Sequence, residues 1–339
     1  MKPAREPGPP GGEPPARTLT YLDAAAIRSA LPMRAAVEVM KTAFADLSAG
    51  AVVMPLRAHV ELPGERSRLL LMPCFSTAAR AASVKTVAQF DDNPARGLPR
   101  IQALVTLHDG DTGEPRAILD GAALTALRTG AAAGAATDLL ARREAATVAI
   151  FGAGVQARTQ LEAMCAVRQV RAARVCGRHH DRAEAFARAC AAAFGIDVRA
   201  VASPAEALRG ADIVCTATPS TRPLFDDRDL APGTHLNAVG AYLPSMREIP
   251  GETVCRARVV VDQRESALAE AGDLLTPIRE GFWSADRIAA ELGEVVRGLK
   301  PGRTGAEEIT LFKSVGLAIQ DLHTAAAIVR RQRSPPGTS

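Results

Sequence analysis

A glycine-rich turn is the clearest chemical signal in this sequence. It reads Gly152-Ala153-Gly154-Val155-Gln156-Ala157 and follows Thr147 to Phe151, a wholly apolar stretch that predicts a buried strand, while the residues through Ala166 predict a helix. In such a turn the first glycine bends the chain, the second lets the backbone approach a pyrophosphate, and the helix N-terminus offers N–H groups to an anion. We therefore expect Gly152 to Ala157 to bind a dinucleotide, although an ordinary tight turn between a strand and a helix can show the same pattern.

The end of the next predicted strand indicates which dinucleotide binds. After Arg174 to Cys176 the chain continues Gly177-Arg178-His179-His180, with no carboxylate before Asp181. NAD enzymes usually place an Asp or Glu here to accept hydrogen bonds from the ribose 2′-hydroxyl, whereas an Arg can bind a 2′-phosphate. We expect Arg178 and His179 to contact NADPH, with NADH possible; an exposed loop arginine is the alternative interpretation.

Three cations in the first half of the chain stand in settings that could bind an anion. Arg57 follows Met54-Pro55, Lys85 lies between apolar neighbours on a predicted strand, and Arg128 lies in a predicted helix. A buried lysine without a partner is costly, so Lys85 should face an anion, either a carboxylate side chain or a ligand. Taken singly, each of the three is better explained as a solvated or paired surface cation.

The elements around these cations predict a largely antiparallel sheet or half-barrel with few helices. Helices are expected at Asp23 to Gly50 and Ala122 to Leu140. Strands are expected at Val52 to Leu62, Leu69 to Pro73, Ser83 to Phe90, Ile101 to His108 and Ala117 to Leu119.

From Ala146 onward, strands and helices alternate. Further apolar strands are predicted at Arg174 to Cys176, Val198 to Val201, Ile213 to Thr216, His235 to Val239 and Arg258 to Asp262, with a helix at Arg182 to Phe194 and late helices at Ser284 to Leu299 and Thr310 to Val329. This alternation is typical of a Rossmann-type, doubly wound parallel sheet. The last helix should return to the first part of the chain, because the parallel sheet is complete before it. The predicted fold class is therefore α/β, with a second α+β part.

Composition narrows the function classes. The 339 residues are 47% hydrophobic and 23% charged with a net charge of +4, a balance typical of a globular protein rather than one that binds nucleic acid. No apolar run is long enough to span a membrane, and the six cysteines show no metal-binding or disulfide spacing. We expect a cytoplasmic protein without a metal, and disordered Pro/Gly-rich tails at residues 1–17 and 333–339.

Short motifs along most of the chain resemble those of the ornithine cyclodeaminase/μ-crystallin family. In order, they are Met54-Pro55-Leu56-Arg57, Lys85 with Asn93-Pro94 and Gly97-Leu98-Pro99, Thr112-Gly113-x-Pro115, Leu119-Asp120-Gly121, Thr125 to Thr129, the glycine turn and Phe312 to Gly316. The resemblance covers residues 18 to 330. It implies a homodimer joined through the first sheet, with a substrate-binding and dimerisation domain (18–135 with 318–332), an NADP-binding domain (136–317) and an active site between them.

The resemblance also implies residue roles. Positions matching Arg57, Lys85 and Arg128 hold the carboxylate of the substrate in this family. It further places Thr129, Thr218, Ser220, Ser314 and Gly316 at the cofactor, together with the glycine turn and the Arg178 segment.

One position departs from part of the family. Cyclodeaminases and related alanine dehydrogenases carry Asp where this chain has Tyr242, and a phenol with a pKa near 10 is a poor base at neutral pH. Met246-Arg247-Glu248 resembles instead the Δ1-pyrroline-2-carboxylate and Δ1-piperideine-2-carboxylate reductases and ketimine-reducing μ-crystallin. The resemblance thus implies NADPH-dependent reduction of a small cyclic imino acid to L-proline or L-pipecolate.

Three points stay open at the level of sequence. Lys85, Tyr242 or a water could deliver the proton to the imine nitrogen. A cyclodeaminase or amino-acid dehydrogenase on the same scaffold is the first alternative, and a crystallin-like protein that holds NADPH and a small ligand without turnover is the second.

Overall fold

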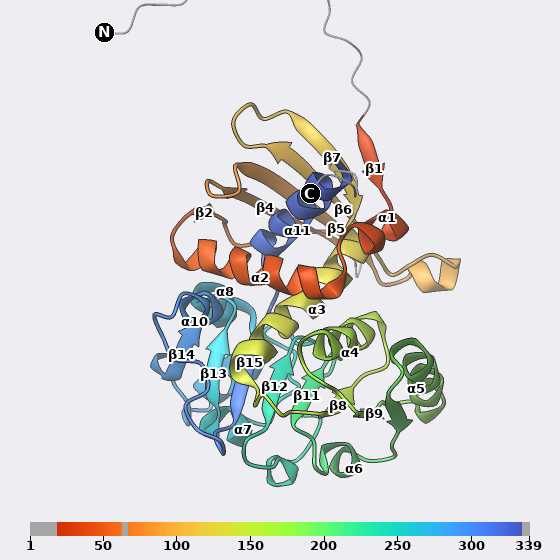
Figure 1. The fold of residues 1–339 in the computed structure, drawn as a ribbon, viewed down its shortest axis with the longest axis vertical. Helices are drawn as coiled ribbons and strands as arrows, with labels where there is room; N and C mark the ends of the chain where they lie inside the picture. Colours follow the sequence, from red (N-terminus) through yellow and green to blue (C-terminus); the bar gives the residue numbers. More distant parts are fainter. Residues whose placement is uncertain (1–18, 63–66, 334–339) are drawn as a thin grey trace, which may run out of the picture.

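The structure, a computed structural model, describes residues 19–62 and 67–333 and contains two sheets (Figure 1). The first has seven strands in the order β1-β7-β6-β5-β4-β2, with β3 paired to β4. All neighbours are antiparallel except β1 and β7. The bounds are β1 Thr20–Leu22, β2 Val52–Val53, β3 Ala58–Glu61, β4 Ser67–Ser76, β5 Ala81–Phe90, β6 Ile101–Asp109 and β7 Pro115–Asp120.

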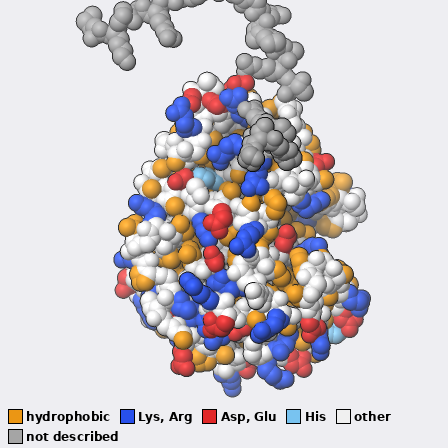
Figure 2. Space-filling view, in the orientation of Figure 1, with side chains coloured by type: hydrophobic (Ala, Val, Ile, Leu, Met, Phe, Trp, Pro, Cys, Tyr) orange, Lys and Arg blue, Asp and Glu red, His pale blue; other side chains and the backbone are white. Residues whose placement is uncertain are grey.

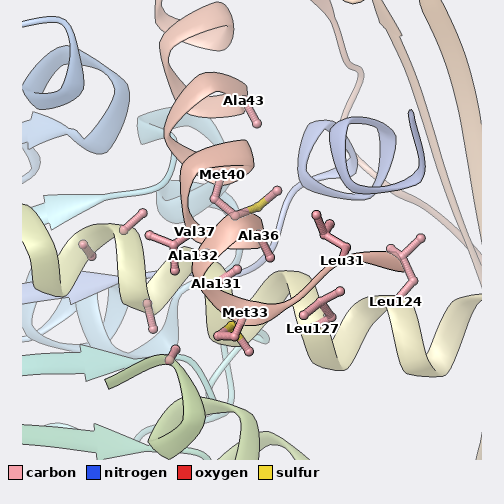
Figure 3. Close-up of a cluster of buried hydrophobic side chains, with 14 of the residues drawn as sticks. Leu31, Met33, Ala36, Val37, Met40, Ala43, Leu124, Leu127, Ala131 and Ala132 are labelled. Atoms are coloured by element: carbon pink, nitrogen blue, oxygen red, sulfur yellow. The ribbon is translucent and has the colours of Figure 1, made fainter. Parts of the chain in front are cut away.

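Helices cover one face of this sheet. They are α1 (Ala24–Ala30), α3 (Gly121–Leu140) and α11 (Ala318–Arg333), of which α11 lies against β4, β5 and β6. A further helix, α2 (Met33–Ser48), packs on α3 and α11. Side chains at helical spacing on α2, such as Met33, Val37 and Met40, pack against α3 (Figure 3). The two helices come close because α3 is rich in small residues there. A Cβ on Gly134 would lie 2.7 Å from Cγ2 of Val37.

The second sheet is wholly parallel, with the order β10-β9-β8-β11-β12-β15-β13-β14. Its strands are β8 Thr147–Phe151, β9 Ala172–Cys176, β10 Asp197–Ala200, β11 Ile213–Thr216, β12 His235–Ala238, β13 Arg258–Val261, β14 Ile288–Glu291 and β15 Thr310–Lys313. Its helices are α4 Val155–Val167, α5 His180–Phe194, α6 Pro204–Leu208, α7 Gly251–Arg256, α8 Arg264–Glu270, α9 Gly272–Arg279 and α10 Leu292–Val296. Strand order reverses between β8 and β11, and ligands of such sheets bind at the carboxyl ends of the strands there. The predicted fold class is confirmed.

Two expectations about the late helices are wrong. Thr310 to Val329 is not one helix, because its first four residues form β15, in the interior of the parallel sheet, and α11 begins only at Ala318. Ser284 to Leu299 contains a short 3-10 helix, then β14 and then α10. Short buried strands and buried helical turns are both apolar, so periodicity alone cannot separate them.

Two expectations near the N-terminus also change. The helix predicted over Asp23 to Gly50 is broken by Leu31-Pro32, because proline cannot continue a helix in its interior. The strand predicted over Val52 to Leu62 is two strands, β2 and β3, separated by the segment that carries Arg57.

The helix α3 joins the two parts of the molecule. It runs without a break past residue 135, where the sequence predicts a domain boundary, and it packs against α2 and also against α4. The approach to α4 is so close that a Cβ on Gly130 would lie 2.5 Å from the carbonyl oxygen of Thr159. The predicted tails lie outside the described residues, apart from Arg333, which ends α11.

The surface and the thiols agree with a globular chain. Figure 2 shows acidic and basic side chains interspersed on the visible face rather than gathered in one stripe. All six cysteines are free. Across residues 19–62 and 67–333, the helices are too short or too polar to cross a bilayer.

Candidate active site

Two of the three predicted cations meet a common carboxylate. Lys85 on β5 places its Nζ 2.7 Å from Oδ2 of Asp321 on α11, and Nε of Arg128 on α3 lies 3.1 Å from Oδ1 of the same residue. Arg128 also donates through Nη1 to Oε1 of Gln320, at 2.7 Å. The side chains of Lys85 and Asp321 are 2% and 1% exposed, so this pair is removed from water.

The surroundings of Lys85 weaken its hold on a proton. Burial and the positive charge of Arg128 lower the pKa of Lys85 to about 7, and Asp321 offsets only part of that effect. The charge of Arg57 acts in the same direction. One more negative charge nearby would therefore stabilise the ammonium form of Lys85.

Arg57 lies in the same cluster from a third direction. Its Nε is 2.9 Å from Oε1 of Glu270, at the end of α8, and its Nη2 donates to the carbonyl oxygens of Val315 at 3.0 Å and Gly316 at 2.7 Å. The fold thus brings Arg57, Lys85 and Arg128 together from three separate elements.

The segment that follows β15 lies against these cations. Oδ2 of Asp262 accepts hydrogen bonds from Ser314 Oγ at 2.8 Å and from the N–H groups of Val315 and Gly316 at 2.8 and 3.0 Å. Gly316 has φ of +81°, and a Cβ there would lie 2.6 Å from Nη1 of Arg128. Only glycine fits this position, which sets Ser314 and Gly316 next to the cations.

Sequence reasoning missed the acids of this cluster. The apolar neighbours of Lys85 predict an anion but do not identify Asp321, and the sequence predicts no role for Glu270. Asp262 is buried and was predicted only as the end of a strand. Lys85 and Arg128 thus share one carboxylate, that of Asp321, whereas Arg57 pairs with Glu270.

Glu270 has an unused oxygen. Its Oε1 bonds Arg57, whereas Oε2 is buried and has no hydrogen-bond partner among the described residues. Burial raises the pKa of Glu270, Arg57 lowers it in part, and Asp262 raises it further. This carboxyl group can therefore carry a proton at a higher pH than an exposed glutamate.

The glycine turn has the geometry that a dinucleotide needs. Gly152 has φ of +112°, its N–H donates to the carbonyl oxygen of Cys176 at 3.0 Å, and a Cβ would lie 2.8 Å from Ala217 O. By contrast, a Cβ on Gly154 would meet nothing within 4 Å, and no side chain caps the N-terminus of α4. Open space in front of uncapped N–H groups fits a pyrophosphate.

The rest of this turn and its neighbours line the same edge of the sheet. Ala157 is fully buried against the core, Val155 is 68% exposed, and the buried Oε1 of Gln156 has no partner among the described residues. Beyond β9, Arg178 and His179 are exposed, and Arg178 forms no ion pair with any residue that the structure describes. Both follow Cys176, the residue that Gly152 contacts.

Other predicted cofactor residues lie at several places around this edge. Thr218 and Ser220 follow β11, and the N–H of Ser220 donates to Oγ1 of Thr218. Thr129 is buried on α3 directly after Arg128. Tyr242, predicted as a possible proton donor and not as a cofactor residue, follows β12 and is half-buried against the core of the parallel sheet. No hydrogen bond or ion pair links it to the cation cluster within the described residues.

A parallel sheet with a glycine turn at its switch point, beside a second sheet with a buried cation cluster, defines a two-part protein of the dinucleotide-binding α/β class. The model of the ornithine cyclodeaminase/mu-crystallin family matches residues 19–335. The chain belongs to this family, as its motifs predict.

Individual relatives match most of the chain. A Δ1-pyrroline-2-carboxylate reductase of Bacillus cereus is 40% identical over 305 residues, which are 90% of this chain and 94% of that protein. The ketimine reductase mu-crystallin of Mus musculus is 37% identical over 279 residues, 82% of this chain and 85% of the relative. The solved structure of Thermococcus litoralis Δ1-pyrroline-2-carboxylate reductase, in complex with NADH and L-proline, has a TM-score of 0.89 at 38% identity, covering 93% of this chain and 98% of that one.

Proposed function

We propose that the protein reduces a cyclic imino acid, Δ1-pyrroline-2-carboxylate or Δ1-piperideine-2-carboxylate, to L-proline or L-pipecolate. The observation that carries this proposal is the positive charge that Lys85 and Arg128 together carry in excess of their one shared carboxylate, that of Asp321. One substrate carboxylate balances that charge. The reductases among the relatives, one of them solved with L-proline, support the same reaction.

The roles of the side chains follow from their charge and position. Arg57, Lys85 and Arg128 hold the substrate carboxylate, which fixes the orientation of the ring. A nicotinamide cofactor bound along Gly152–Ala157 would supply the hydride that adds to the C=N carbon. The protein then has to supply one proton to the imine nitrogen.

Glu270 is the proton donor in this proposal. Its Oε2 is buried without a partner, its pKa is raised by burial, and its other oxygen is fixed by Arg57. Lys85 already contacts Asp321 and is assigned to the carboxylate, and Tyr242 has no hydrogen bond or ion pair to the cluster in the described part of the chain. Glu270→Gln keeps the shape but removes the acid, so kcat should fall by about 10²- to 10⁴-fold with little change in KM.

The cofactor in this proposal is NADPH. Arg178 is exposed at the carboxyl end of β9, where an NAD enzyme would place a carboxylate. The similar Thermococcus litoralis reductase was solved with NADH, so NADPH and NADH have to be compared directly as cofactors of this protein.

A spectrophotometric assay tests the reaction. Absorbance at the NADPH wavelength should decay with either imine, and L-proline or L-pipecolate should accumulate in equal amount. Ammonia released from L-ornithine or L-lysine without net cofactor consumption would instead identify a cyclodeaminase. Tight NADPH binding with no turnover of any imine would favour a crystallin-like binding protein.

A further inference from the structure

A fully buried trio of charged residues lies beneath the carboxyl edge of the parallel sheet and takes no part in the reaction described above. It consists of Glu248, Asp273 and Lys313, which we call the Glu248 network. All three side chains are 0% exposed. Replacing buried ions by apolar side chains is often neutral or stabilising, so stability alone gives little reason to keep them.

Glu248 ties together the loops that follow two adjacent strands. Its Oε2 accepts hydrogen bonds from Thr216 Oγ1 at 2.8 Å, Gly240 N at 2.8 Å and Ala241 N at 3.1 Å. Its Oε1 accepts two more, from the N–H and the Oγ1 of Thr218, at 2.7 and 2.8 Å. One carboxylate thus satisfies donors at the ends of both β11 and β12.

The other two members fix Glu248 and its loop from below. Oδ1 of Asp273 accepts from the N–H groups of Glu248 and Ile249, at 2.6 and 2.9 Å. Nζ of Lys313 lies 2.9 Å from Oδ2 of Asp273 and donates to the carbonyl oxygen of Ala241 at 2.6 Å. Lys313 directly precedes Ser314, so the network reaches the ends of three strands, β11, β12 and β15.

The backbone of these loops is closely packed. A Cβ on Gly240 would lie 2.4 Å from Oε1 of Glu248, and one on Gly272 would lie 2.0 Å from the carbonyl oxygen of Met246. The strand β11 borders the switch point, where the N–H of Ala217 donates to the carbonyl oxygen of Phe151, the residue before the glycine turn, at 3.0 Å. The loops held by Glu248 therefore border the crevice on the side away from Arg178.

We propose that Glu248 is a positioning residue for the nicotinamide half of the cofactor. This inference rests on the proposed function, because it assumes that a nicotinamide dinucleotide binds at the switch point. The adenosine half would depend on Gly152–Ala157 and Arg178, none of which Glu248 touches. The nicotinamide half would depend on the loops after β11, β12 and β15, which the Glu248 network fixes.

The test compares two ligands on one variant. Glu248→Gln places an amide where the N–H groups of Thr218, Gly240 and Ala241 require acceptors, so some of those hydrogen bonds are lost. Calorimetry would measure the affinity of the protein for the whole cofactor, NADPH or NADH as the wild type prefers, and for the cofactor fragment that lacks only nicotinamide. The whole cofactor should bind at least tenfold more weakly, whereas the fragment should change by less than twofold.

Matched variants make the outcome decisive. Glu252→Gln changes an exposed glutamate on α7 and should alter neither affinity. If Glu248→Gln does not fold, Thr216→Val removes one of the five hydrogen-bond donors to Glu248 with little change of shape. It should weaken binding of the whole cofactor about threefold more than binding of the fragment. Equal losses for both ligands, or no loss for either, would overturn the inference. Wild-type protein that binds the cofactor but turns over no imine would refute the proposed reaction alone. The difference between the affinity lost for the whole cofactor and the affinity lost for its fragment could still be measured.

Discussion

At the residue scale, the choice of cofactor depends on one exposed arginine. Arg178→Ala should raise the KM for NADPH about 10- to 100-fold, because one or two charge-assisted hydrogen bonds to the 2′-phosphate are lost, while the KM for NADH changes less than twofold. Steady-state kinetics with both cofactors measure this. Arg188→Ala, an exposed arginine further along α5, is the matched control and should change neither KM. An equal rise for NADPH and NADH would contradict the role given to Arg178.

Lys85 makes a second prediction at this scale, about pH. The pKa of Lys85 is lowered to about 7, so its ammonium, the form that attracts a carboxylate, is lost as the pH rises through 7. Binding of L-proline to the cofactor-loaded protein should therefore weaken above about pH 7, by up to about tenfold per pH unit. Calorimetric titrations between pH 6 and 9 would show this.

Lys85→Met provides the control for that titration. It removes the ionisable group, so L-proline should bind weakly at every pH and with no dependence on pH. A wild-type affinity that stays constant from pH 6 to 9 would show that Lys85 does not titrate in this range.

At the element scale, a glycine inside α3, Gly130, and the glycine at the N-cap of α4, Gly154, should respond differently to alanine. Helix propensity alone would make Gly130→Ala stabilising by about 1 kcal/mol, but its Cβ would lie 2.5 Å from Thr159 O. We expect a net loss of about 2 kcal/mol in the free energy of unfolding, measured with urea. Because the space around Gly154 is open, Gly154→Ala should change that free energy by less than about 1 kcal/mol and weaken cofactor binding instead.

The sequence predicts some elements better than others for physical reasons. The glycine turn and its flanking strand and helix were predicted because each has its own local pattern. β14 and β15 were not, because a strand of four residues is too short to show a period that separates it from a helix. The break at Pro32 has a local cause, because proline cannot continue a helix, whereas the break before Arg57 accompanies a contact with Glu270, far along the chain.

The same division applies to the site. Lys85 in an apolar strand predicts a buried anion, and the family motifs add Arg57 and Arg128. Asp321 and Glu270 lie on helices far along the chain, and nothing in their local sequence tells which cation they meet. Their roles follow only from the fold, which closes α11 over β5 and sets α8 beside the segment of Arg57.

At the scale of the whole molecule, the uncovered face of the first sheet predicts a homodimer. The helices cover one face, and the other presents apolar side chains that are 36% to 66% exposed, namely Tyr21, Val53, Val60, Phe75 and Leu104. Such a contiguous apolar surface is typical of an interface. Light scattering should give twice the chain mass of 35.5 kDa.

One charge on that face should separate the two copies. Leu104→Glu should give the mass of a single chain, because a carboxylate buried in an apolar interface is costly. Leu299→Glu, at a 59% exposed leucine in the second part of the molecule, should leave the mass unchanged. Wild-type protein that is monomeric at micromolar concentration would contradict the dimer.

The position of α11 has a consequence for the order of events during synthesis. The sheet that carries Lys85 leaves the ribosome early, yet the carboxylate that pairs with Lys85 belongs to Asp321, near the end of the chain. The nascent sheet therefore lacks its covering helix α11, and Lys85 and one apolar face stay exposed while the whole parallel sheet is translated. Chains released shortly before Ala318 would contain every glycine of the cofactor turn and still lack a closed first core, which makes them natural clients for chaperones and proteases.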